Sequence, residues 1–191
     1  MNARTGKGFT LTELIISTLL VGLVILSAVS ADLTSRQFFK SAEDIIRVQD
    51  EAKIAMEHIA KNVSRGIGSL DSPAYTLSGP TNRIRVNIDG LLTGNTNGRF
   101  GDAADDGTIE YEFDTVNHRI VFDPNTDDAV VGDKENITTE VIANCSFSAS
   151  ADLNRIDVFI EARRDPTKAA SNKNPEVSLS SSVVLRAMSC N

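Results

Sequence analysis

The 191-residue chain contains no tryptophan, and aromatic residues make up only five per cent of it. Proteins that bind single-stranded nucleic acid commonly stack the bases on aromatic side chains, and this composition offers few such platforms. The formal net charge of −7 also opposes binding to nucleic acid, because most of that affinity comes from basic residues that neutralise phosphates. The composition therefore argues against a nucleic acid partner.

Residue patterns typical of enzymes are also scarce. The only two histidines, His58 and His118, lie far apart in the sequence, and neither is surrounded by metal-ligand spacing. We expect His58 to lie on the flank of a helix and His118 to lie in a turn. The serines at 180–182 lack the flanking glycines of a nucleophile elbow. No glycine-rich phosphate-binding loop follows a predicted strand. We therefore expect that the protein is not an enzyme.

The chain has only two cysteines, Cys145 and Cys190. In an exported domain, which sits in an oxidising compartment, two cysteines favour a single disulfide, and two buried free thiols are the alternative. A bridge would close a loop of about 46 residues and contribute on the order of 4 kcal/mol in the chain-entropy model. It would also fix a C-terminus that would otherwise fray.

A short basic leader is followed by a long apolar segment. The junction reads Lys7-Gly8-Phe9-Thr10-Leu11-Thr12-Glu13, and the apolar run extends from Leu14 to Val29. A helix over residues 9–31 would be about 34 Å long, enough to cross a hydrocarbon layer of ~30 Å. A carboxylate at the centre of such a helix costs roughly 2.5 to 3.5 kcal/mol, so one that is kept within a membrane segment usually has a partner. Cleavage after Gly8 would create one, the new amine of Phe9.

This junction resembles the class III signal of type IV prepilins and type II secretion pseudopilins. The resemblance implies that a dedicated peptidase cleaves between Gly8 and Phe9 and methylates the new N-terminus on Phe9. It also implies that Glu13, the fifth residue of the mature chain, pairs with the N-terminal amine of a neighbouring subunit during assembly. The alternatives are an ordinary secretory signal, which has a shorter apolar region before its cleavage site, and a simple membrane anchor.

The helix is expected to continue beyond the membrane segment, from about residue 10 to residue 65. Apolar residues recur at steps of three and four, and polar residues occupy the other face. No proline precedes Pro73, and Gly66 and Gly68 supply a stop signal. We divide the chain into a prepilin leader (1–8), a transmembrane and filament-core helix (9–31), its amphipathic continuation (32–67) and a β-rich globular domain (68–191).

From residue 70 onward, polar and apolar residues alternate, which is typical of strands. We expect a hairpin turn at 114–117. No helical pattern alternates with the strands, so the sheet should be antiparallel. The predicted fold class is α+β and pilin-like: a long N-terminal helix, apolar in its first half and amphipathic in its second, packed on a C-terminal antiparallel β-sheet. The expected strands are 83–88, 108–113, 119–122, 137–142, 146–149, 155–162 and 177–187.

Two charged loops are further candidate sites. Asp102, Asp105 and Asp106 lie in the loop 93–107 and could provide oxygen ligands for calcium, although a solvated turn before a strand is the alternative. No other cofactor is expected. The loop 163–175 carries four basic residues and only one acidic residue. It could contact DNA or another ligand, whereas a solvated loop or a salt bridge between subunits is the alternative.

Taken together, these features predict a structural subunit, a minor pilin or minor pseudopilin of a type IV pilus or type II secretion filament. The lack of proline in the apolar helix and the strand series ending at 183–187 are similar to minor subunits of the PilW and GspJ kind. A major pilin and a DNA-binding or adhesive pilin are the alternatives. The implied partners are other subunits, the prepilin peptidase, the inner-membrane assembly platform and, before assembly, lipid. The implied location is the bacterial inner membrane, with the C-terminal domain in the periplasm, and later a periplasmic or extracellular filament.

Overall fold

The computed structural model describes residues 10–67, 74–79, 82–92, 106–126, 133–149 and 155–185. The chain divides into two compact units, Met1–Glu43 and Asp44–Asn191. The helix α1 (Leu11–Val63) contributes residues to both units. Its bounds confirm the helix that was expected from about residue 10 to residue 65.

In the first unit, α1 begins with a capping box formed by Thr10 and Glu13. The backbone N–H of Glu13 donates to Oγ1 of Thr10 (3.3 Å), and the backbone N–H of Thr10 donates to Oε2 of Glu13 (3.4 Å). Each side chain thus satisfies a backbone donor that the first helical turn leaves without a partner. The helix therefore starts at a local signal in the sequence.

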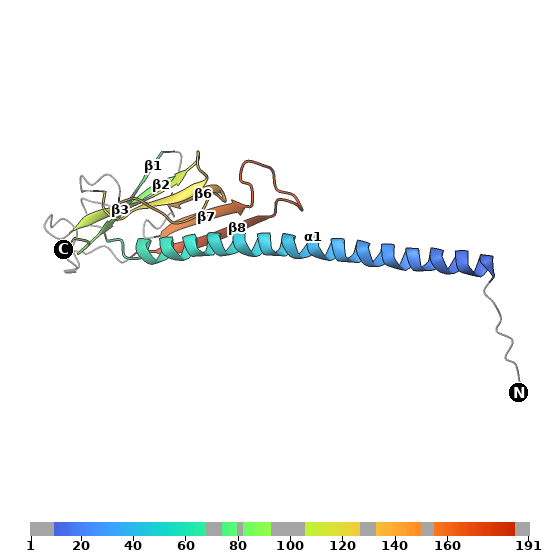
Figure 1. Ribbon diagram of the computed structural model, residues 1–191. Helices are drawn as coiled ribbons and strands as arrows, with labels where there is room; N and C mark the ends of the chain where they lie inside the picture. Colours follow the sequence, from blue (N-terminus) through green and yellow to red (C-terminus); the bar gives the residue numbers. More distant parts are fainter. Residues whose placement is uncertain are drawn as a thin grey trace, which may run out of the picture. The chain divides into compact units, whose positions relative to one another are not determined.

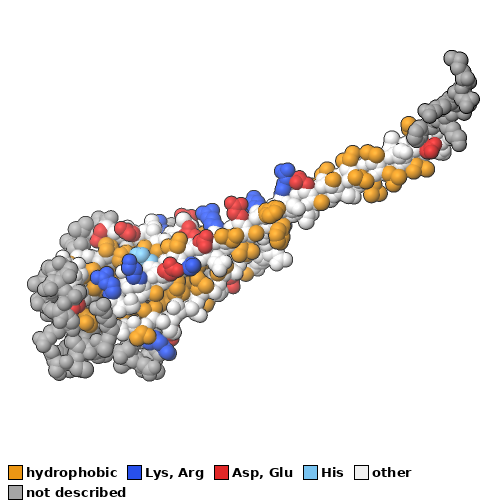
Figure 2. Space-filling model, turned by 90° about the horizontal axis from the view of Figure 1, so that it is seen from below, with side chains coloured by type: hydrophobic (Ala, Val, Ile, Leu, Met, Phe, Trp, Pro, Cys, Tyr) orange, Lys and Arg blue, Asp and Glu red, His pale blue; other side chains and the backbone are white. Residues whose placement is uncertain are grey.

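Hydroxyl groups within this part of α1 are satisfied by the helix itself. Ser17, Ser27 and Thr34 donate to the carbonyl oxygen four residues earlier, each at 2.8 Å, and Thr18 donates to carbonyls of the preceding turn. Such bonds leave few polar groups that need water. The outer surface is dominated by hydrophobic side chains, which Figure 2 shows along this helical segment.

The second unit contains two antiparallel sheets (Figure 1). The first has the order β1-β2-β3-β4-β5, and the second has the order β6-β7-β8. Neighbouring strands in both sheets follow one another along the chain, as expected for an antiparallel meander. The strands are β1 (Tyr75–Ser78), β2 (Arg83–Ile88), β3 (Gly107–Asp114), β4 (Arg119–Asp123), β5 (Glu135–Asn136), β6 (Ile142–Ala149), β7 (Arg155–Arg163) and β8 (Glu176–Val184).

The core of this unit forms where the part of α1 from Asp44 onward packs on the sheets. Figure 1 shows this part of the helix running along β7 and β8. Alternate residues of β2, β3 and β7 face the helix and are buried, as in Ile84, Tyr111 and Ile160. The buried face of α1 consists of Val48, Ala52, Ala55, Met56, Ile59 and Val63. The predicted α+β arrangement is confirmed, with two sheets in place of one.

The turn between β3 and β4 confirms the hairpin predicted at 114–117. Oδ1 of Asp114 accepts hydrogen bonds from the backbone N–H groups of Val116 and Asn117, both at 3.0 Å. His118 completes the turn with a φ of 53°, a left-handed conformation that is uncommon for residues other than glycine. A short acidic side chain at the start of a turn is the usual way to stabilise it.

The strand predicted at 137–142 is wrong. The chain forms only the two-residue β5 before this segment, and β6 begins at Ile142. Between them, the Thr138 hydroxyl accepts a hydrogen bond from the backbone N–H of Ile120 (3.0 Å). The Glu51 carboxylate accepts one from the backbone N–H of Thr139 (3.0 Å). These side-chain bonds replace a regular ladder, although the residue types favour a strand. β1 was not predicted, and β8 ends at Val184, three residues before the predicted end.

Candidate functional site

The first candidate site is the start of α1, around Glu13. The exposed carboxylate accepts hydrogen bonds from the N–H of Thr10 (3.4 Å) and from its hydroxyl (3.3 Å). Its place in the first helical turn is also favourable, because the N-terminal end of a helix carries partial positive charge. The predicted cleavage site, Gly8 and Phe9, lies outside the described residues, so pairing of Glu13 with an amine stays a prediction.

The segment after Glu13 presents an apolar surface on all sides. Each large aliphatic residue between Leu11 and Val29 is exposed, by 48 to 76%. The helix is long and apolar enough to cross a membrane, and none of its most apolar window is buried in the structure. So much continuous apolar surface needs lipid or other protein to cover it. The residues are Leu11, Leu14, Ile15, Ile16, Leu19, Leu20, Val21, Leu23, Val24, Ile25, Leu26 and Val29.

Polar residues begin directly after this apolar surface. Asp32 and Arg36 form an exposed ion pair (2.9 Å) on successive helical turns. Phe38 and Phe39 follow, with 71% and 70% of their surface exposed, and their rings make an edge contact with centroids 6.3 Å apart. This segment thus combines charged residues with two large, mostly exposed apolar side chains.

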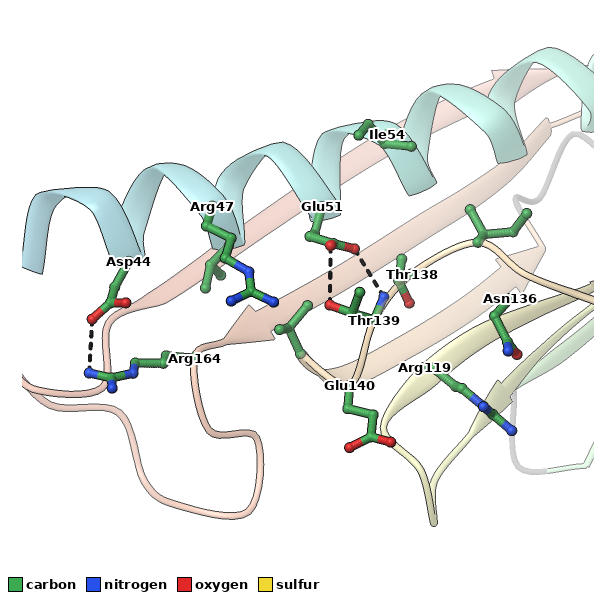
Figure 3. Close-up of a pocket in the computed structure, with 13 residues that line it drawn as sticks. Asp44, Arg47, Glu51, Ile54, Arg119, Asn136, Thr138, Thr139, Glu140 and Arg164 are labelled. Atoms are coloured by element: carbon green, nitrogen blue, oxygen red, sulfur yellow. Dashed lines mark hydrogen bonds and ion pairs between the residues drawn. The ribbon is translucent and has the colours of Figure 1, made fainter. Parts of the chain in front are cut away.

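The second candidate site is a groove in the second unit, between α1 and the segment 136–141 (Figure 3). It encloses about 810 Å³. Val48 and Val141 line it as buried residues, and Ile54, which also lines it, is 57% exposed. The exposed side chain of Arg47 extends from α1 into the groove in Figure 3.

Two polar contacts hold the walls of this groove together. The carboxylate of Glu51 accepts hydrogen bonds from the backbone N–H (3.0 Å) and hydroxyl (3.1 Å) of Thr139. Nearer the start of the unit, Arg164 forms an ion pair with Asp44 (2.8 Å). Sequence reasoning did not find this groove, because 88 and 120 residues separate the partners of these two contacts.

His58, predicted to be a residue on the helix flank, joins α1 to the first sheet. Its Nδ1 lies 2.9 Å from the hydroxyl of the buried Tyr111, which also accepts a hydrogen bond from Asn62 (2.8 Å). The ring of Phe122 packs against His58 at a centroid distance of 5.0 Å. Burial lowers the pKa of His58 from its usual 6.5, with Glu135 opposing and Lys61 adding to that shift. The cluster is well packed and fits a structural role.

The predicted calcium site is only partly visible. Asp102 and Asp105 lie outside the described residues, whereas Asp106 is nearly buried immediately before β3. Within the described ranges, no group of three or more histidine, cysteine, aspartate or glutamate side chains could hold a metal ion. Calcium binding by the three aspartates stays a prediction.

The basic loop 163–175 is fully described, and most of its charges are paired. Arg163 contacts Glu176 (2.7 Å) and Glu161, Arg164 contacts Asp44, and Lys168 contacts Asp165. The side-chain amide of Asn174 closes the loop by donating to three carbonyl oxygens within it. Cations that already have acidic partners are poorly placed to attract a phosphate backbone.

Of the two cysteines, Cys145 is described and Cys190 lies outside the described residues. Cys145 lies in the core, on β6, and has no disulfide partner among the described residues. Burial raises the pKa of this thiol to about 12. No disulfide is seen in the described part of the chain, so the bridge between Cys145 and Cys190 stays a prediction.

Comparison with known proteins identified no relative: no family model, curated protein or solved structure matches the chain.

Proposed function

We propose that the chain is a structural subunit of a filament of the type IV pilus or type II secretion class, and within that class a minor subunit. In this proposal a prepilin peptidase removes residues 1–8 and methylates Phe9. The apolar helix first anchors the chain in the bacterial inner membrane, with the globular domain in the periplasm. The assembly platform then transfers it into a filament. The proposal gives the chain a structural role and no catalytic one.

The observation that carries this proposal is an apolar helical surface that contains one carboxylate. Twelve large side chains are exposed on this part of α1, and Glu13 lies in its first turn. A plain membrane anchor accounts for the side chains, and the capping box with Thr10 accounts for the place of Glu13, but neither supplies an opposite charge for the carboxylate. A helix that exchanges lipid for neighbouring helices accounts for both features.

The local bonds of Glu13 leave room for another partner. Its contacts with Thr10, at 3.3 and 3.4 Å, are longer than most hydrogen bonds to a carboxylate. An amine of a neighbouring copy would make a stronger interaction, because opposite charges attract more strongly in a medium of low dielectric constant. Removing one member of such a pair leaves an uncompensated charge, which is strongly destabilising.

The test uses Glu13→Gln and Glu13→Ala in cells that contain the chain's own assembly machinery. We expect both variants to be cleaved to a chain that begins at Phe9, as mass spectrometry can show, but to be largely missing from purified filaments. Asp50→Asn is the matched control, because it removes an exposed acid from the same helix outside the apolar segment. Normal incorporation of both Glu13 variants, or a native chain that still carries residues 1–8, would contradict the proposal.

The alternatives within this class differ in their support. A major subunit would be recognised by its copy number in purified filaments. A DNA-binding or adhesive subunit would use the basic loop 163–175, but ion pairs of Arg163, Arg164 and Lys168 with acidic residues disfavour it. We therefore retain the minor structural subunit as the proposed function.

A further inference from the structure

Phe38 and Phe39 form an exposed aromatic pair on α1, just beyond the apolar surface. The ion pair between Asp32 and Arg36 precedes them, so this part of the helix is suited to water rather than to hydrocarbon. Two phenylalanines that are about 70% exposed in water carry a large unfavourable surface, since each can bury 150–250 Å². Aromatic side chains, phenylalanine among them, are enriched in the buried cores of protein–protein interfaces.

The groove of the second unit has the properties of a receptor for such a pair. It has apolar surface from Val48, Val141 and the exposed side chain of Ile54. Arg47 projects into it (Figure 3), and a guanidinium group can rest on the face of an aromatic ring. Its volume of about 810 Å³ is within the usual range for pockets that take up a small ligand, and so it has room for two aromatic rings.

We propose that Phe38 and Phe39 of one copy dock into this groove of a neighbouring copy of the chain. The proposal rests on the proposed function, in which copies pack side by side through α1. The groove is bounded by α1 itself, so a neighbouring helix that lies along α1 meets it directly. The occupant is thus a second copy of this chain, and its aromatic pair covers the exposed Ile54.

Charges around the two surfaces are complementary. Glu43 follows Phe39 by one helical turn and is exposed on the docking segment, whereas Arg47 is exposed at the groove. Neither takes part in an ion pair within the described part of the chain. When the aromatic pair enters the groove, Glu43 of the first copy can reach Arg47 of the second. Pairing of this kind fixes the orientation of the two helices more than it adds affinity.

Cysteine cross-linking between two differently tagged copies tests this contact in assembled filaments. One copy carries Phe39→Cys and the other carries Ile54→Cys, so only a link between two molecules gives a product with both tags. The matched control pairs Phe39→Cys with Lys53→Cys. Lys53 is adjacent in sequence and similarly exposed, but it does not line the groove. The parent chain controls for links through its own cysteines.

We expect the pair at 39 and 54 to cross-link several-fold more than the pair at 39 and 53. Arg47→Glu, tested in the same cross-linking background, should reduce the 39–54 product, whereas Lys53→Glu should leave it unchanged. Filaments that form normally but give equal products at 53 and 54 would overturn the docking contact and leave the proposed function standing. A parent chain that never enters filaments would overturn the proposed function and the docking contact with it.

Discussion

At the scale of single residues, the contact between His58 and Tyr111 links α1 to the first sheet. A neutral imidazole lets Nδ1 accept a hydrogen bond from the Tyr111 hydroxyl, whereas protonation of Nδ1 removes that acceptor. The sequence placed His58 on the flank of a helix but could not reveal its partner, because Tyr111 is 53 residues away. Contacts across such a separation depend on how the elements pack.

The lowered pKa of His58 predicts that the folded unit loses stability in acid. Below the usual pKa of 6.5, the unfolded chain binds a proton at this histidine more readily than the folded chain does. The stabilisation is therefore complete above 6.5 and is lost as the pH falls through the lowered folded-state value. Because the ring is only partly buried, we expect a loss below about 1 kcal/mol.

Denaturant unfolding of the full chain in detergent, compared between about pH 7.5 and 5.5, would measure this effect. The His58→Asn variant should show a shallower decline than the parent chain, since asparagine does not titrate. Equal pH dependence of the two proteins would show that His58 does not contribute.

At the scale of elements, Gly66 has a packing role just after the end of α1. The sequence suggested that Gly66 stops the helix. A glycine that ends a helix commonly adopts a positive φ, but Gly66 is not among the residues with positive φ. Its role is close approach: a Cβ at this position would lie 2.7 Å from Cγ1 of Val86 on β2 and 2.9 Å from Cδ2 of Leu185. The missing side chain lets the chain just after α1 lie directly against β2 and Leu185.

We therefore predict that Gly66→Ala destabilises the second unit by about 1 to 3 kcal/mol, because the new methyl group overpacks the core. Gly22→Ala is the matched control, since nothing lies within 4 Å of a Cβ there. Thermal unfolding followed by circular dichroism should show a lower midpoint for the first variant only. A Gly66→Ala protein as stable as the parent would mean that this contact relaxes without cost.

Strand prediction succeeded where the sequence pattern is local. The alternation over 83–88 and 108–113 corresponds to β2 and β3, and Asp114 marks the turn after them. It failed at 137–142. There the backbone N–H of Thr139 donates to Glu51 of α1, and the hydroxyl of Thr138 accepts a hydrogen bond from the backbone N–H of Ile120 in β4. A strand pattern describes residue types, but the available partners decide whether a ladder forms.

At the scale of the whole molecule, the chain combines an apolar helical unit with a unit that has its own core. None of the most apolar window of the first unit's helix is buried in the structure. The second buries its hydrophobic side chains between helix and sheets. Apolar side chains are exposed in the first unit and buried in the second, which indicates that the two units have different surroundings.

The apolar segment of α1 leads to a prediction for the intact protein. Leu20→Lys should weaken insertion by roughly 2.5 to 3.5 kcal/mol, because a charged side chain is placed within the apolar run. Leu20→Ala, which removes the same side chain without adding charge, is the control. Alkaline extraction of membranes should release much more of the lysine variant than of the alanine variant. Equal retention would argue that α1 does not span the bilayer.

The sequence by itself determined α1 and most of the strands. The capping box of Thr10 and Glu13, the apolar run and the alternation of β2 and β3 are all set by residues a few positions apart, whose effects act before any distant contact forms. Only the tertiary structure decided the division into two sheets, the groove and the role of Gly66. Those features depend on contacts such as Glu51 with Thr139 and Asp44 with Arg164, and no local pattern encodes them, because packing alone brings their partners together.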